Sequence, residues 1–252
     1  MKTSCLTNLI QLYELIEQTT SNTIVRNDQL KSIICPHSSW PNMIYEIDTN
    51  PTKLENTIQA IQSRVSRNKL PPYCMFDSNL LDKEAFEQFS SVVSENRYWD
   101  YMEYNLNESI LLQDLPHFTV KQIQTNLEIL DWVLTMENSI MKGRKLDPEL
   151  FLDLNKHDDV EYYLGYENEI PVAGSMLFKK DDIAGVYMIG TLEKFQRKGY
   201  GSALTQYVLK RGFELNCKKA ILQATNVGAK LYRKLGFTIE GRIELFNLRP
   251  NL

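Results

Sequence analysis

The chain has 252 residues, of which 43% are hydrophobic and 24% charged, and its formal net charge is −4. Its length favours two domains, and its negative charge does not indicate nucleic-acid binding. No segment approaches the ~18 apolar residues of a membrane span, and polar residues interrupt the first apolar stretch too early for a secretory signal. Its four cysteines and three histidines are scattered without metal-ligand spacing, which is typical of a reduced cytoplasmic protein and predicts no metal site.

Glycine and charge divide the chain into two parts. All 11 glycines lie at or after Gly143. Residues 151–252 hold 15 Lys+Arg and 12 Asp+Glu, a net charge of +3, and the remaining 13 and 20 give residues 1–150 a net charge of −7. An anionic coenzyme is therefore expected on the basic C-terminal part.

Residues 1–115 are expected to form a smaller α/β domain. Apolar residues at helical spacing and short runs of β-favouring residues alternate along it. The predicted elements are helices over residues 6–16, 54–65 and 85–93 and strands over residues 42–47, 73–76 and 98–106. Because this part contains no glycine, it has no glycine-rich phosphate loop.

Residues 116–252 follow a boundary predicted near Leu115–Pro116. Leu127, Leu130 and Leu134 are expected on the apolar face of the first helix of this part. The predicted elements are strands over residues 118–123, 160–166, 170–178, 182–191 and 219–225, helices over residues 127–140, 147–155, 204–215 and 225–235, and one or two closing strands over residues 237–248.

The most informative segment reads Gln-Arg-Lys-Gly-Tyr-Gly-Ser-Ala, residues 196–203, between a predicted strand and a predicted helix. Gly199 and Gly201 allow a tight turn and the close approach of a ligand. The helix offers unpaired N–H groups and the positive end of its dipole, and two basic residues add charge. This glycine loop therefore predicts a diphosphate site. A Rossmann fingerprint is excluded because Leu204 stands where its third glycine would be, and a Walker loop because Gly-Lys-Ser/Thr is absent.

A second motif, residues 224–237, reads Ala-Thr-Asn-Val-Gly-Ala-Lys-Leu-Tyr-Arg-Lys-Leu-Gly-Phe. Together the two motifs resemble those of the GNAT superfamily of acyl-CoA-dependent N-acyltransferases. The glycine loop from Gln196 matches the family's pattern Gln/Arg-x-x-Gly-x-Gly/Ala. Residues 224–237 match a variant of the family's second pattern, Ala-Ser/Thr-x-x-Gly-x-x-Leu-Tyr-x-x-x-Gly-Phe. The resemblance covers about residues 116–252. The chain departs from the commoner form of the second motif, because Thr225 stands where that form has asparagine and Asn226 lies one place later.

The resemblance implies a GNAT-like mixed central sheet flanked by helices, with acetyl-CoA as the acyl donor. It implies that Tyr232 lies near the coenzyme sulfur and protonates the departing thiolate, while a backbone N–H near Ile189 stabilises the oxyanion. The residues expected to contact the coenzyme are Met188, Ile189, Thr191, Gln196, Arg197, Lys198, Gly199, Gly201, Ser202 and Asn226.

The general base is left open by the sequence. The predicted central strand, residues 183–189, contains no carboxylate or histidine. Glu193 is the nearest acid downstream and is the first candidate, a water relay is an equal alternative, and Tyr187 is a weaker one.

Two functions are consistent with these residues. The first is an N-acetyltransferase in which a primary amine of a small molecule or a peptide attacks acetyl-CoA directly. The second is a non-catalytic acyl-CoA sensor or interaction module. The N-terminal part is interpreted either as a degenerate GNAT-like half or as an unrelated α/β cap, and both a monomer and a homodimer stay open.

Overall fold

The structure is a computed structural model and describes residues 4–19, 23–93, 95–108 and 110–248. The N-terminal half contains α1 (Ser4–Thr19), β1 (Thr23–Arg26), β2 (Lys31–Ile34), β3 (Met43–Tyr45), α2 (Leu54–Ser66), β4 (Tyr73–Asp77), α3 (Lys83–Ser91) and β5 (Glu95–Asn105). The C-terminal half contains β6 (Phe118–Gln122), α4 (Asn126–Asn138), α5 (Pro148–Leu154), β7 (Val160–Glu167), β8 (Ile170–Lys180), β9 (Ile183–Thr191), the 3₁₀ turn η1 (Glu193–Phe195), α6 (Tyr200–Glu214), β10 (Lys219–Ala224), α7 (Asn226–Lys234) and β11 (Thr238–Asn247).

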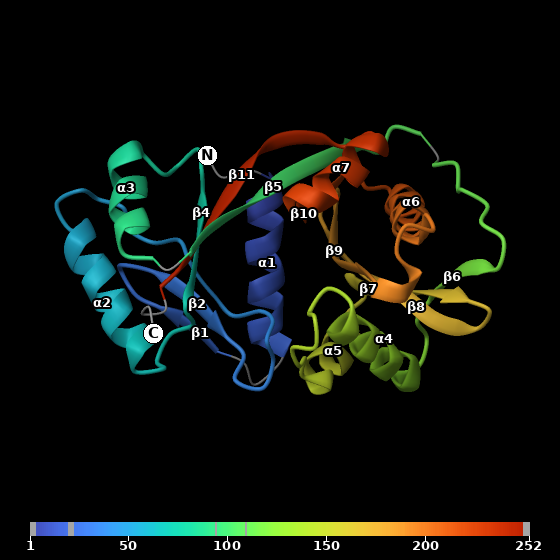
Figure 1. Cartoon of the computed structure of the whole chain (residues 1–252), viewed down its shortest axis with the longest axis horizontal. Helices are drawn as coiled ribbons and strands as arrows, with labels where there is room; N and C mark the ends of the chain where they lie inside the picture. Colours follow the sequence, from blue (N-terminus) through green and yellow to red (C-terminus); the bar gives the residue numbers. More distant parts are fainter. Residues whose placement is uncertain (1–3, 20–22, 94, 109, 249–252) are drawn as a thin grey trace.

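In the described part of the chain, one mixed sheet of 11 strands runs through the whole molecule, with helices on both of its faces (Figure 1). The strand order is β1-β2-β3-β4-β11-β5-β10-β9-β8-β7-β6. The predicted mixed α/β architecture is therefore confirmed. The predicted boundary near residue 115 falls in the connection between β5 and β6, and it stays a prediction.

The two halves repeat one another and exchange their last strands. The order β1-β2-β3-α2-β4-α3-β5 in the first half is the order β7-β8-β9-α6-β10-α7-β11 in the second. β5 pairs with β10 along the whole length of β10, and β11 lies between β4 and β5. Ile243 of β11 is thereby aligned with Asp77 of one neighbour and Trp99 of the other. Each half therefore completes its sheet with a strand of the other half.

Two short strands, β1 and β2, were not predicted from the sequence. They form an antiparallel hairpin of four residues a side. The Asn27 side chain accepts hydrogen bonds from the N–H groups of Gln29 and Leu30 at the turn, an Asx turn that replaces the usual glycine. Strands this short carry too few alternating residues to be recognised by periodicity.

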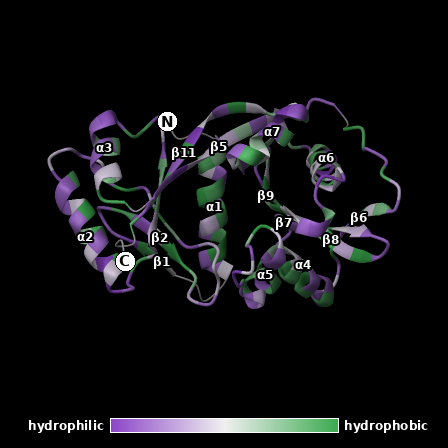
Figure 2. Cartoon of the chain, in the orientation of Figure 1, coloured by the Kyte–Doolittle hydropathy of each residue, from purple (hydrophilic) through white to green (hydrophobic). Residues whose placement is uncertain are grey.

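Helix α1 packs across the sheet on the face that also carries α4 and α5. Cys5, Leu12 and Ile16 are fully buried. α1 contacts β8, β9 and β10 of the C-terminal half, and Tyr13 packs against Tyr45 of β3, with 5.5 Å between ring centroids. In Figure 2 this helix, which carries both hydrophobic and hydrophilic residues, lies between the β1–β2 hairpin and α5. α1 therefore joins the cores of both halves into one.

The apolar face predicted for α4 is wrong. Leu127, Leu130 and Leu134 are exposed to 75%, 43% and 56%. The face that packs on the sheet consists instead of Ile129, Trp132, Val133 and Met136. Both stripes have helical spacing, so periodicity alone cannot choose between them. The buried stripe includes Trp132, whose indole Nε1 donates a hydrogen bond to the carbonyl oxygen of Ser175 in β8 at 3.0 Å.

Candidate active site

The central feature of the candidate site is a fork between two parallel strands. β9 and β10 pair only from Lys219–Ile221 to Ile183–Gly185. Beyond that point the strands separate, and Met188 of β9 adopts a positive φ of 53° next to a shift in register against β8. The fork consists of residues 186–191 of β9 and 222–224 of β10. Backbone polar groups of β9 that face the fork have no β10 partner and are free to bind a ligand.

The N-terminus of α6 faces this region and is not capped by a side chain. Gly199 is the N-cap residue, with the positive φ of 88° that the sequence predicted for a tight turn. The first helical hydrogen bond runs from the N–H of Ala203 to the carbonyl oxygen of Gly199 at 3.0 Å. The N–H groups of Tyr200, Gly201 and Ser202 therefore have no partner within the helix, and they lie at the positive end of its dipole.

The space beside Gly201 fits an anionic group. A Cβ placed on Gly201 would have one heavy atom of the described residues within 4 Å, Thr191 Oγ1 at 3.8 Å, so none of those residues fills this position. Gln196 closes the loop from the other side by donating a hydrogen bond from Nε2 to the carbonyl oxygen of Thr191 at 3.1 Å. Open backbone donors beside an open space are the chemistry that binds a phosphate.

The glycine loop is anchored to the sheet edge by aromatic and ionic contacts. The Tyr200 ring stacks on Phe118 of β6, with 4.2 Å between centroids, and its hydroxyl donates to Glu167. Lys198 Nζ lies 2.7 Å from the same carboxylate. Hydrogen bonds from Lys198 and Tyr200 hold the pKa of Glu167 below its usual value. Lys198, expected at the coenzyme, is thus turned toward Glu167, whereas Arg197 is exposed.

Tyr232 lies buried on the same face of the sheet as α6. The Thr225 side chain caps α7 by accepting a hydrogen bond from the N–H of Gly228 at 3.3 Å. Tyr232 is 8% exposed and makes an edge contact with Phe237, with 5.7 Å between centroids. Burial raises the pKa of Tyr232, so its hydroxyl keeps its proton at neutral pH and can act as a donor. Asn226, the first residue of α7, is exposed.

The remaining predicted residues lie along β9 and just beyond it. Met188 is buried on the α1 side of the sheet, while Ile189 packs against the core under α6. Glu193 is exposed on η1, two residues after the end of β9. The opposite side of this strand is closed by the end of α4, because a Cβ on Gly190 would lie 2.5 Å from Ser139 Oγ.

The sequence did not reveal a buried polar cluster behind the fork. Tyr187 donates a hydrogen bond to Asn8 Oδ1 of α1 at 2.7 Å, and Gln223 Nε2 lies 3.1 Å from Cys5 Sγ. Asn8 Nδ2 is buried and has no hydrogen-bond partner among the described residues. Burial raises the pKa of Tyr187 well above its ordinary value, which argues against this residue as a base. Only the packing of α1 brings these residues together, and no local pattern signals it.

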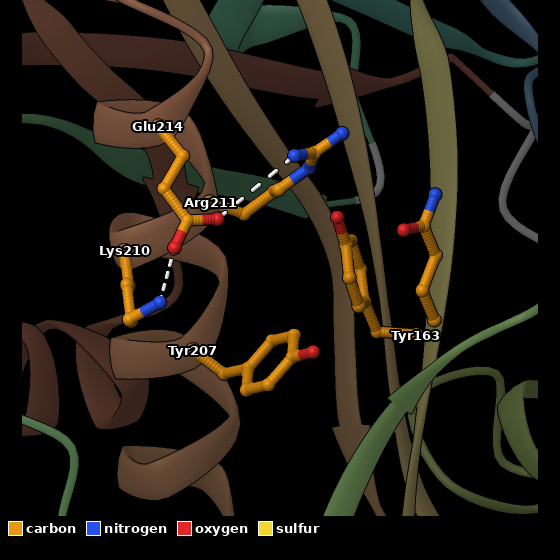
Figure 3. Close-up of a pocket in the computed structure, with 6 residues that line it drawn as sticks. Tyr163, Tyr207, Lys210, Arg211 and Glu214 are labelled. Carbon is orange, nitrogen blue, oxygen red and sulfur yellow. Dashed lines mark hydrogen bonds and ion pairs between the residues drawn. The ribbon is translucent and has the colours of Figure 1, made fainter.

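A small cavity of about 150 Å³ lies on the far side of α6, against β6 and β7 (Figure 3). Its cations are already paired, Lys210 with Glu214 and Arg211 with Glu161 at 2.7 Å. Among the described residues no cluster of His, Cys, Asp and Glu could hold a metal ion. Within the same residues, no helix combines the length and the apolar character that crossing a bilayer requires.

Comparison with known proteins identifies the family. Residues 127–237, from α4 to the end of the second motif, match the model of the acetyltransferase (GNAT) family. The C-terminal half of this chain belongs to the GNAT family. Acyl-CoA-dependent acetyl transfer is therefore its general activity, and the resemblance noted in the two motifs is confirmed. No curated protein sequence matches the chain.

Solved structures extend the GNAT likeness to the whole chain. A GCN5-related N-acetyltransferase from Kribbella flavida is 15% identical with a TM-score of 0.71, covering 99% of this chain and 98% of that one. A GCN5-related N-acetyltransferase from Sphaerobacter thermophilus is 12% identical with a TM-score of 0.70, covering 95% and 86%. Because the shared fold includes α1 to β5, the N-terminal half is also GNAT-like in fold, rather than an unrelated cap.

Proposed function

We propose that the protein transfers the acetyl group of acetyl-CoA to a primary amine of a small molecule or a peptide, by direct attack of the amine on the thioester. The observation that supports this most is the combination of a fork between β9 and β10 with an uncapped helix N-terminus at Gly199–Ser202. A buried, protonated Tyr232 lies on the same face of the sheet.

In this proposal the diphosphate of the coenzyme binds the N–H groups of Tyr200, Gly201 and Ser202, and its pantetheine arm enters the fork beside β9. The residues proposed to contact the coenzyme are Met188, Ile189, Thr191, Gln196, Arg197, Lys198, Gly199, Gly201, Ser202 and Asn226. Lys198 contributes mainly by fixing the loop, because its ammonium group is paired with Glu167. Arg197 is the exposed cation available to the phosphates.

Amide formation needs a base, an oxyanion donor and a proton donor. A free alkyl amine has a pKa of ~10 and must lose a proton to attack the carbonyl carbon. Glu193 or a water molecule is proposed to take that proton, since the buried Tyr187 hydroxyl is already donating to Asn8. A backbone N–H near Ile189 stabilises the oxygen of the thioester carbonyl as negative charge develops. Tyr232 then donates its proton to the thiolate as the carbon–sulfur bond breaks.

A non-catalytic acyl-CoA sensor is the alternative, and release of the coenzyme thiol separates the two. Acetyl-CoA is incubated with a series of primary amines, and free thiol is measured together with the acetylated product. Turnover that depends on the amine supports the enzyme. Coenzyme binding without turnover of any amine would favour the sensor.

Replacement of Tyr232 by phenylalanine tests its role. It keeps the ring that packs on Phe237 and removes the proton donor, so kcat should fall roughly 10²-fold when chemistry is rate-limiting. The KM for acetyl-CoA should hardly change, because the lost interaction strengthens only in the transition state. Tyr207→Phe removes a hydroxyl from α6 on the side away from the fork and is the matched control. Equal kcat values for Tyr232→Phe and the wild type would exclude Tyr232 from the mechanism.

A further inference from the structure

The outer face of α4 carries apolar side chains that no other part of the described chain covers. Leu127, Leu130 and Leu134 follow one another at helical spacing and are exposed to 75%, 43% and 56%. Ile140, in the turn after the helix, is exposed to 42%. In Figure 1, α4 lies at the outer side of the sheet next to α5. These four residues form the outer patch of α4.

The outer patch is a cluster rather than a scatter of single residues. Among the described residues nine large hydrophobic side chains are exposed, and four of them belong to this patch. The other five are distributed over the β4–α3 turn, the β5–β6 connection, the start of β8 and α7. Single exposed apolar residues are ordinary, whereas a contiguous exposed patch marks an interaction surface.

Charges of opposite sign lie at the two ends of the outer patch. Asp131 is on the same face of α4, three residues before Leu134, and it is exposed. Lys142 and Arg144 follow the patch in the α4–α5 connection and are exposed as well. Within the described part of the chain, none of these three charged side chains forms an ion pair. A surface that is acidic at one end and basic at the other is complementary to its own copy turned end to end.

We propose that the outer patch is the interface of a homodimer, in which the two α4 helices pack antiparallel across a two-fold axis near Leu134. Each contact of such an interface occurs twice. Leu127 lies seven residues before Leu134 and Ile140 six residues after it, so the leucine of each copy faces the isoleucine of the other. Asp131 of each copy then lies beside the basic connection of the other. Because a Cβ on Gly190 would lie 3.4 Å from Ile140 Cβ, the interface reaches the end of β9.

The charges favour a second copy over a membrane surface. An anionic membrane binds helices whose polar edges are basic, whereas Glu128 and Asp131 border this patch along the helix. A standard interface buries about 800 Å² per partner, and four side chains supply only the centre of such an area. We therefore expect a concentration-dependent dimer with a Kd in roughly the micromolar range.

The first test measures the Kd of the dimer by sedimentation equilibrium over a wide range of protein concentrations. Leu134→Glu places two carboxylates against each other at the two-fold axis and should weaken the dimer at least ~100-fold. Leu80→Glu is the matched control, because Leu80 has a similar exposure of 51% but lies outside the patch; this variant should dimerise like the wild type. An unchanged Tm for each variant, measured at a concentration where the wild type is monomeric, verifies that the fold is intact.

The second test uses charge reversal to detect the antiparallel arrangement. Asp131→Lys and Lys142→Glu should each weaken the homodimer about three- to tenfold, because each creates two like-charged contacts. An equimolar mixture of these two variants should associate about as tightly as the wild type, because every such contact in the heterodimer joins opposite charges.

Three results would overturn the proposal in its entirety: a wild type that stays monomeric at all concentrations, an unchanged Kd in Leu134→Glu, or an equal loss of dimer in Leu80→Glu. A mixture of the two charge-reversal variants that associates no better than either variant alone would overturn the antiparallel pairing.

Discussion

Substitution of Gly201 separates coenzyme binding from fold stability, because the structure predicts opposite effects on the two. The space beside Gly201 is open, and Gly201 is the second residue of α6. Gly201→Ala should therefore stabilise the free protein by about 0.4–1 kcal/mol, since alanine loses less conformational entropy in a helix. Gly201→Glu should also fold, because a carboxylate at a helix N-terminus interacts favourably with the dipole.

The glutamate side chain occupies the proposed phosphate space, and its carboxylate also repels the diphosphate, whereas the family motif accepts alanine at this position. Acetyl-CoA at a hundredfold excess over its Kd should stabilise the wild type by ~2.7 kcal/mol. For a chain of this size that corresponds to a rise in Tm of roughly 5–10 °C. Gly201→Ala should show the same rise as the wild type from a higher starting Tm, and Gly201→Glu should show none.

The assay is thermal unfolding followed by circular dichroism, with acetyl-CoA titrated into each variant. The Tm of the free variants is the control for folding. A coenzyme-induced rise in Gly201→Glu equal to that of the wild type would refute the placement of the diphosphate at α6.

Three other measurements follow from contacts described above. Gly185→Ala should lower the free energy of unfolding, measured by denaturant titration, by about 1–3 kcal/mol, because the alanine Cβ would overlap Asn8 Oδ1 in the core. Unchanged stability would show that α1 does not pack against Gly185 as described. Hydrogen bonds in the fold lower the pKa of Glu167, so the stability that this carboxylate contributes is present at neutral pH and is lost as the pH falls below about 5. The Tm of Glu167→Gln should therefore fall less between pH 6 and pH 3 than the Tm of the wild type. Parallel profiles of Tm against pH for the two proteins would contradict this. Burial raises the pKa of Cys5 to about 12, so iodoacetamide at pH 8 should alkylate Cys5 at least ~10³-fold more slowly in the native than in the unfolded protein. Rapid alkylation of Cys5 in the native protein, detected by peptide mapping, would contradict its burial.

The glycine loop could be predicted from sequence because every feature that forms it is local. Two glycines, a preceding strand and a following helix lie within a few residues of one another, and a left-handed residue at Gly199 has an evident sequence signature. The same holds for the α7 cap at Thr225 and the left-handed residue at Gly236, which ends that helix with a φ of 97°. The contacts of these residues with coenzyme stay predictions.

Features that depend on distant parts of the chain could not be predicted. The choice between the two apolar faces of α4 is made by the sheet beneath it, where Trp132 meets Ser175. The hydrogen bond of Tyr187 joins it to Asn8, 179 residues earlier. The exchange of β5 and β11 also leaves no local trace, since either strand has the same alternation whichever half it joins.

The strand exchange has a consequence for how the protein is made. β11 lies between β4 and β5, yet it is synthesised more than 130 residues after β5. Until residues 238–247 have left the ribosome, β4 and β5 each lack a neighbour, and unpaired edges of this kind are prone to aggregation. We expect β4 to pair directly with β5 in the nascent chain, because β5 is the one strand of the N-terminal half that is synthesised after β4. This pairing must open again to admit β11, so we expect the last step of folding to be slow and to depend on chaperones.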